Sequence, residues 1–209
     1  HYNDGNGADA GHVRVYENVS GTWTQIGSDI DGEAAGDVSG NDVSFNASGT
    51  TVAIGAPLND GNGTDAGHVR VYENVSGTWT QMGSDIDGEA AGDQFGHAIS
   101  LSSDGDTIAI GGRGNDGNGT DAGHVRVYGN VSGTWTQMGS DIDGEAAGDQ
   151  SGRSVSLSSD GSTVAIGGHR NDGNGTDAGH VRIYKSVSGT WTQMGSDIDG
   201  EAAGDQSGY

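Results

Sequence analysis

Residues 59–114, NDGNGTDAGHVRVYENVSGTWTQMGSDIDGEAAGDQFGHAISLSSDGDTIAIGGRG, are followed directly by a second copy of the same length. Residues 115–170 match this copy at 47 of 56 positions without insertion or deletion, and the differences include mild exchanges such as Ile99 against Val155. The same pattern starts at Asn3 and again at Asn171. A fixed period of this length is typical of repeat proteins, in which each repeat is one supersecondary unit.

Each period contains four short segments that alternate in side-chain size with period two and are bounded by Gly, Asp, Asn and Ser. They lie at residues 98–102, 107–111, 68–72 and 78–82. The Asp-Gly pair within residues 103–106 predicts a tight hairpin turn between the first two. One face of this hairpin is bulky and the other is small, so we expect bulky faces to pack onto small ones. The bulky face holds Ile99, Leu101, Ile108 and Ile110, and the small face Ala98, Ser100, Ala109 and Gly111.

Stacked four-stranded antiparallel units of this size predict an all-β fold, a β-propeller of about three and a half blades. A parallel β-solenoid is the alternative, although its repeats are usually shorter and lack two hairpin turns per unit. Relative to four full periods the array is 15 residues short, equivalent to one inner hairpin, which flanking sequence or a neighbouring molecule would supply. We expect a window on a longer array, divided into residues 1–40 (outer two strands of a partial blade plus an interblade loop), 41–96 and 97–152 (one blade each) and 153–209 (a blade plus the start of the next connection).

The composition excludes several classes of protein. The chain has 30 acidic and 8 basic residues, for a formal net charge of −22, so a basic groove for nucleic acid is not expected. No apolar run approaches the roughly 20 residues of a membrane-spanning helix, so no membrane insertion is expected. The absence of Cys excludes a disulfide framework.

Two short motifs carry a resemblance to a known family. Phe95-Gly96 enters a predicted first strand and Gly55-Ala56-Pro57 leaves a second strand. These pieces and the four-strand order resemble the FG-GAP repeats of integrin α subunits and of many secreted microbial and algal proteins, over essentially the whole chain. The resemblance implies a propeller at an extracellular or cell-surface location. Elsewhere the motifs are degenerate: Ser39-Gly40, Ser151-Gly152 and Ser207-Gly208 replace the first, and Gly111-Gly112 and Gly167-Gly168 the second.

The connections between blades carry alternating carboxylates, a pattern that suits Ca²⁺ because this ion takes six to eight oxygen ligands. The calcium-binding loops of integrin propellers lie between the first two strands of a blade, whereas the acidic loops here lie between blades, so the position of the site does not carry over. In these loops the glycine follows the second carboxylate and not the third, which weakens the match to a calcium loop. The alternative is a solvated turn. If the loops bind a cofactor, it is Ca²⁺, and no organic cofactor is expected. The candidate ligands are Asp29, Asp31, Glu33 and Asp37; Asp85, Asp87, Glu89 and Asp93; Asp141, Asp143, Glu145 and Asp149; and Asp197, Asp199, Glu201 and Asp205.

Other polar positions have both a functional and a structural interpretation. The loop at residues 59–65 offers Asp60, Asn62 and Asp65 as cation ligands, but its Asn-Gly and Asp-Gly pairs are turn formers first. If the source is eukaryotic, Asn-x-Ser/Thr sequons predict N-glycosylation. The glycans would be spread unevenly, because the fourth repeat lacks one of the sequons. They fall at Asn18, Asn46, Asn62, Asn74, Asn118, Asn130 and Asn174.

Histidine and tryptophan recur once per period. For the histidines we expect a structural role, with a hydrogen bond to the Asp three residues earlier. For the tryptophans we expect packing between blades rather than stacking on sugars. The histidines are His12, His68, His124 and His180, and the tryptophans are Trp23, Trp79, Trp135 and Trp191.

Repetition guides the functional prediction, because an enzyme needs one asymmetric pocket and nearly every candidate residue occurs in equivalent copies. We therefore expect a non-enzymatic structural or interaction module of a surface coat, adhesin or filament, binding copies of itself, neighbouring repeats, glycans or surface proteins. The alternative is a calcium-dependent, integrin-like adhesion propeller. A hydrolytic enzyme is the third possibility and would need a non-repeated acid or His beside a pocket; His97 and His169 are the unique internal histidines.

Overall fold

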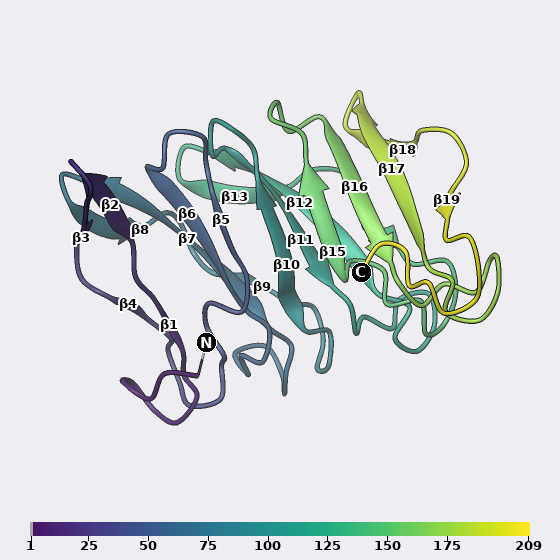
Figure 1. Ribbon diagram of the computed structural model, residues 1–209, viewed down its shortest axis with the longest axis horizontal. Helices are drawn as coiled ribbons and strands as arrows, with labels where there is room; N and C mark the ends of the chain where they lie inside the picture. The colour runs from purple at the N-terminus through teal and green to yellow at the C-terminus, as the bar shows by residue number, and fades with distance from the viewer. Residues whose placement is uncertain (1) are drawn as a thin grey trace.

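The computed structural model describes residues 2–209, which form short strands joined by turns. No helix in this range is long and apolar enough to cross a membrane. Successive sheets stand side by side along the molecule, from the N-terminal to the C-terminal end (Figure 1). The strands are β1 (His12–Val13), β2 (Tyr16–Val19), β3 (Thr22–Gln25), β4 (Ile30–Asp31), β5 (Val43–Phe45), β6 (Thr51–Ala56), β7 (His68–Val75), β8 (Thr78–Gln81), β9 (Ile86–Asp87), β10 (Phe95–Leu101), β11 (Thr107–Gly112), β12 (His124–Val131), β13 (Thr134–Gln137), β14 (Ile142–Asp143), β15 (Ser154–Leu157), β16 (Thr163–Gly168), β17 (His180–Val187), β18 (Thr190–Gln193) and β19 (Ile198–Asp199).

Three sheets share one topology, which confirms the expected all-β fold of repeated antiparallel sheets. Their strand orders are β5-β6-β7-β8, β10-β11-β12-β13 and β15-β16-β17-β18. A short fifth strand, β9, β14 or β19, pairs with the first half of the third strand in each sheet. Periodicity did not reveal this strand because two residues are too short to show alternation. Two smaller sheets, β1-β4 and β2-β3, repeat the outer part of this pattern at the N-terminal end.

The core lies between successive sheets and confirms the expected packing of bulky faces on small ones. Ile108 and Ile110 are fully buried in one cluster with Ala53 and Val71 of the preceding sheet. In the next cluster Ala109 of the middle sheet occupies the place that Ala53 holds in the first. Small residues on one sheet leave room for branched side chains on the next, and the contact excludes water from both.

The two motif glycines meet between sheets. Gly55, near the end of β6, lies against Gly96 of β10, and a Cβ at Gly55 would collide with the Gly96 carbonyl oxygen. Gly96 has φ of 87°, a left-handed conformation that favours glycine. The same contact recurs between Gly111 and Gly152 and between Gly167 and Gly208. This contact explains why the later repeats retain the glycines of both motifs although they lack the Phe and the Pro.

Tryptophan also joins neighbouring sheets, as expected for a packing role. The indole Nε1 of Trp135 donates to the Met82 carbonyl oxygen of the preceding repeat at 2.9 Å. The equivalent bonds run from Trp79 to Ile26 at 3.0 Å and from Trp191 to Met138 at 2.7 Å. These side chains lie across the interface between blades, where each also lines a surface pocket.

Candidate functional site

The strongest site candidate lies where the first strands of the three sheets begin. Asn41, His97, Arg153 and Tyr209 stand one repeat apart in sequence and gather at this end of β5, β10 and β15. They line a cavity of about 430 Å³, called here the inner pocket. Its full lining is Asn41, Asp42, His97, Ala98, Arg153, Ser154, Val155 and Tyr209.

Cationic and aromatic side chains contact one another in and beside the inner pocket. Arg153 Nη1 lies 2.6 Å from His97 Nε2 and donates a hydrogen bond to it, since a guanidinium has no acceptor. The Arg153 guanidinium carbon also lies 4.3 Å from the centre of the Tyr209 ring. The edge of His169 packs against the same ring, with centroids 5.2 Å apart. Arg113 Nε donates to Gln94 Oε1 at 2.8 Å.

The electrostatics of this region are unusual for so acidic a chain. Burial, helped by Arg113 and Arg153, lowers the pKa of His97 to about 4, so this imidazole is neutral near pH 7. Burial and then the like charges of Arg153 and Arg170 lower the pKa of Arg113. Among the described residues none of these three arginines forms a salt bridge with a carboxylate. The group therefore carries positive charge that no salt bridge neutralises, although Asp121 acts on Arg113 at longer range, and this charge favours an anion.

One carboxyl group lines the inner pocket within the described part of the chain, that of Asp42. Its Oδ2 accepts a hydrogen bond from the Ile99 amide at 2.8 Å and its Oδ1 one from the Val43 amide at 2.9 Å. Burial raises the pKa of Asp42. The later repeats have Ala98 and Ser154 at this position, so the acid is not repeated. Comparing the repeats at this position would have revealed this acid from the sequence alone.

Divergence between the repeats is concentrated around this pocket. His97/Arg153, Ala98/Ser154 and Ile99/Val155 lie on the strands that line it, and Arg113/His169 belongs to the charged group beside it. Near-identical blades therefore line a pocket that is not symmetric. The nine differences between residues 59–114 and 115–170 are Glu73/Gly129, Phe95/Ser151, His97/Arg153, Ala98/Ser154, Ile99/Val155, Asp106/Ser162, Ile108/Val164, Arg113/His169 and Gly114/Arg170.

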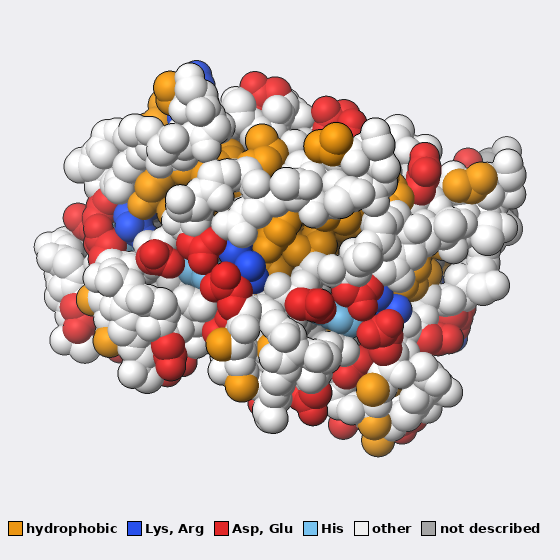
Figure 2. Space-filling view, turned by 180° about the vertical axis from the view of Figure 1, so that it is seen from behind, with side chains coloured by type: hydrophobic (Ala, Val, Ile, Leu, Met, Phe, Trp, Pro, Cys, Tyr) orange, Lys and Arg blue, Asp and Glu red, His pale blue; other side chains and the backbone are white. Residues whose placement is uncertain are grey.

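A second type of cluster lies between blades and includes six of the sixteen loop carboxylates. Each joins a Glu of one interblade connection to a His and an Asp of the next repeat. On the face shown in Figure 2, histidine and arginine side chains appear among acidic ones at successive places along the molecule. The three groups are Glu33, His68 and Asp85; Glu89, His124 and Asp141; and Glu145, His180 and Asp197, with ligand atoms within 4.8 Å of one another.

The recurrent histidines therefore have partners other than those expected. His68 Nδ1 lies 3.8 Å from Asp85 Oδ2 and 3.9 Å from Glu33 Oε2, whereas Asp65 uses its backbone N–H to close a turn onto Asp60. The expected hydrogen bond to the Asp three residues earlier is wrong, because that Asp adopts a left-handed turn with φ of 53°. Burial is the main cause that lowers the pKa of His68, and also that of His180.

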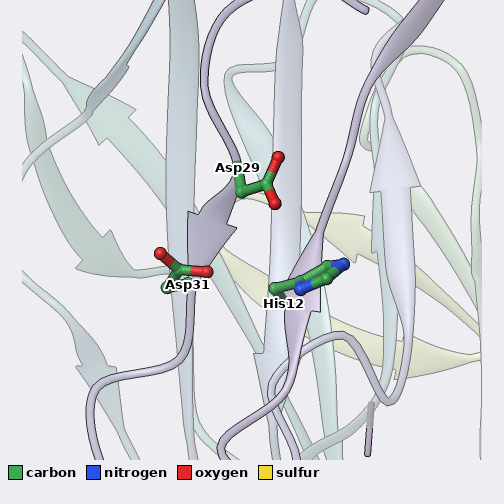
Figure 3. A group of neighbouring side chains, drawn as sticks. All are labelled: His12, Asp29 and Asp31. Carbon is green, nitrogen blue, oxygen red and sulfur yellow. The ribbon is translucent and has the colours of Figure 1, made fainter. Parts of the chain in front are cut away.

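The N-terminal repeat holds a related group, His12, Asp29 and Asp31 (Figure 3). His12 on β1 and Asp31 on β4 come from paired strands, and Asp29 lies just before β4. Arg14 Nε donates to Asp29 Oδ2 at 3.0 Å, which occupies one of its oxygens.

The remaining carboxylates of each acidic loop lie apart from these groups. Asp93 Oδ2 accepts the Ala90 and Glu89 amides at 3.0 and 3.2 Å, so it holds the loop's own turn. Asp37 Oδ2 accepts the Asn59 amide group at 3.1 Å. The same turn role applies to the second polar loop, where Asp60 Oδ1 accepts the Asp65 N–H at 2.9 Å. In the three groups at His68, His124 and His180 the ligand atoms thus combine neighbouring repeats and do not come from a single loop. Of the ten remaining loop carboxylates, Asp29 and Asp31 belong to the group at His12; the others in the described chain are Asp37, Asp87, Asp93, Asp143, Asp149, Asp199, Glu201 and Asp205.

The sequon asparagines take part in turns or in bonds between segments. In Asn62, Asn118 and Asn174 the Nδ2 atom that a glycan would modify donates to the carbonyl of Gly88, Gly144 or Gly200. Asn46 is buried, and Asn18, Asn74 and Asn130 accept the amide of the glycine three residues later.

Comparisons with known proteins fit this fold and its repeat. The profile of the FG-GAP repeat family matches residues 85–128, and so confirms the resemblance seen in the sequence. A search of curated proteins found no match. Among solved structures, the chain is similar to a proposed 6-phosphogluconolactonase of Bacteroides uniformis, with 14% identity and a TM-score of 0.60, over 91% of this chain and 49% of that one. It is similar to the periplasmic gluconolactonase PpgL of Pseudomonas aeruginosa, with 20% identity and a TM-score of 0.60, over 94% and 49%.

These similarities correct the functional prediction. The chain spans about half the length of both structures, and at this identity the likeness is one of fold. Both are propellers described as lactonases, so the expectations of a non-enzymatic structural module and of an adhesion propeller are contradicted. The argument from repetition is wrong because it treated all repeats as equivalent, whereas they differ at the inner pocket.

Proposed function

We propose that this chain supplies the inner pocket of a lactonase-like hydrolase whose substrate is an anionic sugar lactone. The observation that carries the proposal is the convergence of His97, Arg153 and Tyr209, from equivalent positions of diverged repeats, on one cavity that also holds Asp42. The lactonase descriptions of the two similar structures support the reaction class.

The charges of the pocket favour a phosphorylated lactone over a neutral one. Arg113, Arg153 and Arg170 influence one another electrostatically and form no salt bridge with a carboxylate within the described chain, although Asp121 partly offsets the charge of Arg113. Guanidinium groups bind phosphate and carboxylate oxygens through charge-assisted hydrogen bonds. Burial is the main cause that lowers the pKa of Arg113, and a ligand phosphate would compensate the second cause, the like charges of Arg153 and Arg170. We therefore propose 6-phosphogluconolactone, with gluconolactone as the weaker substrate.

Hydrolysis needs a base for the attacking water and a positive group for the developing oxyanion. Asp42 takes the proton from a water molecule as its oxygen attacks the lactone carbonyl carbon. Arg153 stabilises the tetrahedral oxyanion, which then collapses as the ring C–O bond breaks. The ring oxygen takes the proton from Asp42 as it leaves as a hydroxyl group, and this restores the Asp42 carboxylate. The raised pKa of Asp42 suits it to this role, since a base works best near the operating pH. His97 accepts a hydrogen bond from Arg153 and so positions it.

The proposal also places the protein outside the cytoplasm. The FG-GAP match and the periplasmic origin of one similar structure support a secreted or periplasmic location. A closed ring of blades, to which this chain contributes about half, is part of the same proposal.

The test is the initial rate of hydrolysis of 6-phosphogluconolactone and gluconolactone, corrected for the spontaneous reaction. We expect Asp42→Asn to lower kcat by about 10²-fold or more, the usual contribution of a general base. Arg153→Gln should lower kcat for both substrates, because the same oxyanion forms in each reaction, whereas Arg113→Gln should affect the phosphorylated substrate more than the neutral one. Arg14→Gln is the control, because Arg14 is 46% exposed and pairs with Asp29 outside the pocket. A wild-type rate no faster than buffer, or an unchanged rate in Asp42→Asn, would refute the proposal.

A further inference from the structure

The clusters between blades suggest a function separate from the inner pocket. The group of Glu145, His180 and Asp197 shows the arrangement most completely. His180 Nδ1 lies 3.7 Å from Asp197 Oδ2 and 3.8 Å from Glu145 Oε2. These separations are too long for hydrogen bonds. They suit ligands of one cation, since two atoms each about 2.0–2.2 Å from an ion lie roughly 3–4 Å apart.

The histidine provides an observation independent of the acidic residues. The His180 side chain is 1% exposed, and neither ring nitrogen has a hydrogen-bond partner among the described residues. His124 is in the same state, with its side chain fully buried. An unpartnered polar atom in the interior costs free energy. In both residues Nδ1 faces the carboxylates, so a bound cation would give it a partner.

The carboxylates are held in the orientation that a ligand set requires. Gln193 Nε2 donates to Asp197 Oδ1 at 2.6 Å, which leaves Oδ2 facing His180. The equivalent bonds from Gln137 to Asp141 and from Gln81 to Asp85 are also 2.6 Å long. In the same way Arg182 Nη1 lies 3.7 Å from Glu145 Oε1 and leaves Oε2 facing the imidazole. Outer partners of this kind fix metal ligands in proteins.

We propose that Glu145, His180 and Asp197, with the equivalent groups at His68 and His124, bind divalent transition-metal ions such as Zn²⁺ between successive blades. One imidazole and two carboxylates form a mixed nitrogen and oxygen set, which suits Zn²⁺ or Mn²⁺. Ca²⁺ takes six to eight oxygens and is not the preferred ion. Because Glu145 comes from one repeat and His180 and Asp197 from the next, each ion would cross-link two blades.

Zinc titration of chelator-treated protein in 0.15 M NaCl tests this proposal, with calorimetry for stoichiometry and ¹⁵N NMR of the imidazoles for location. We expect at least three tight equivalents and shifts of the Nδ1 signals of His68, His124 and His180. Calcium should give no such shifts. The readout is taken for each histidine, so binding at His12 does not affect it.

Each of two variants tests one site and serves as the control for the other site. Glu145 is 43% exposed and Glu89 is 49% exposed, so each tolerates replacement by Gln without loss of the core. Glu145→Gln should weaken zinc binding at His180 at least tenfold and leave His124 unchanged, and Glu89→Gln should do the reverse. Glu73→Gln is the matched control, because Glu73 is exposed and belongs to no group. Absent Nδ1 shifts in the wild type, or shifts that survive both variants, would overturn the proposal.

Discussion

Arg153 and His97 occupy the same position in successive repeats, yet Arg153 Nη1 lies 2.6 Å from His97 Nε2. Repetition alone would place identical side chains together at this point. Instead Asn41, His97, Arg153 and Tyr209 follow one another around the inner pocket. Sequence divergence at one position of the repeat has thus produced an asymmetric site on a nearly symmetric scaffold.

The pH dependence of stability should report the environment of His97. Its folded pKa is about 4 and its ordinary value is 6.5, so between these pH values the unfolded chain binds a proton that the folded chain does not. The contribution is fully present above pH 6.5 and is lost as the pH falls toward 4. His97→Asn, which installs the residue of the first repeat, should flatten the decline in denaturant midpoint between pH 7 and 4.5. An identical pH profile in wild type and variant would contradict this assignment.

Gly111→Ala tests the contact between motif glycines. A Cβ at Gly111 would collide with the Gly152 carbonyl oxygen of the next sheet. Since backbone cannot move away cheaply, we expect a loss of about 1–3 kcal/mol in the free energy of unfolding. Gly129→Ala serves as the control, because the same position holds Glu17 and Glu73 in other repeats and the nearest atom belongs to the flexible Met138 side chain. Equal effects of both substitutions in urea denaturation would refute the packing account.

Trp135→Phe tests the hydrogen bond between blades. The substitution keeps a large ring but removes the indole N–H that donates to the Met82 carbonyl, which should cost about 1 kcal/mol. Trp23→Phe is the matched control within the same local sequence, since Trp23 is 68% exposed. We expect a lower melting temperature for Trp135→Phe and little change for Trp23→Phe. A larger effect at Trp23 would show that the interblade bond is not what stabilises these residues.

Much of the fold could be predicted from the sequence because the strand pattern and the packing between sheets repeat with the same period. Alternation located the long strands, and the bulky and small faces at Ile108 and Ala109 predicted how sheets pack. The short strand Ile86–Asp87 was not predicted, since its pairing with β7 depends on tertiary contacts.

The sites were harder to predict because their residues come from different repeats. Glu33, His68 and Asp85 are far apart in sequence and meet only when one blade packs on the next. Grouping carboxylates by loop therefore missed His68 as a partner. Repeat comparison could have found Asp42, which stands where later repeats have Ala98 and Ser154. The prediction relied on residues that all repeats share and therefore missed the positions at which the repeats differ.

Calorimetric binding of the two sugar acids formed by the proposed reaction tests the central claim most directly. The inner pocket should bind the phosphorylated acid at least tenfold more tightly than the unphosphorylated one, because about 1.4 kcal/mol of charge-assisted bonding corresponds to that factor. Arg113→Gln should abolish this preference, and Arg14→Gln should preserve it. Equal affinity of the wild type for both acids, or a preference that survives Arg113→Gln, would contradict the account.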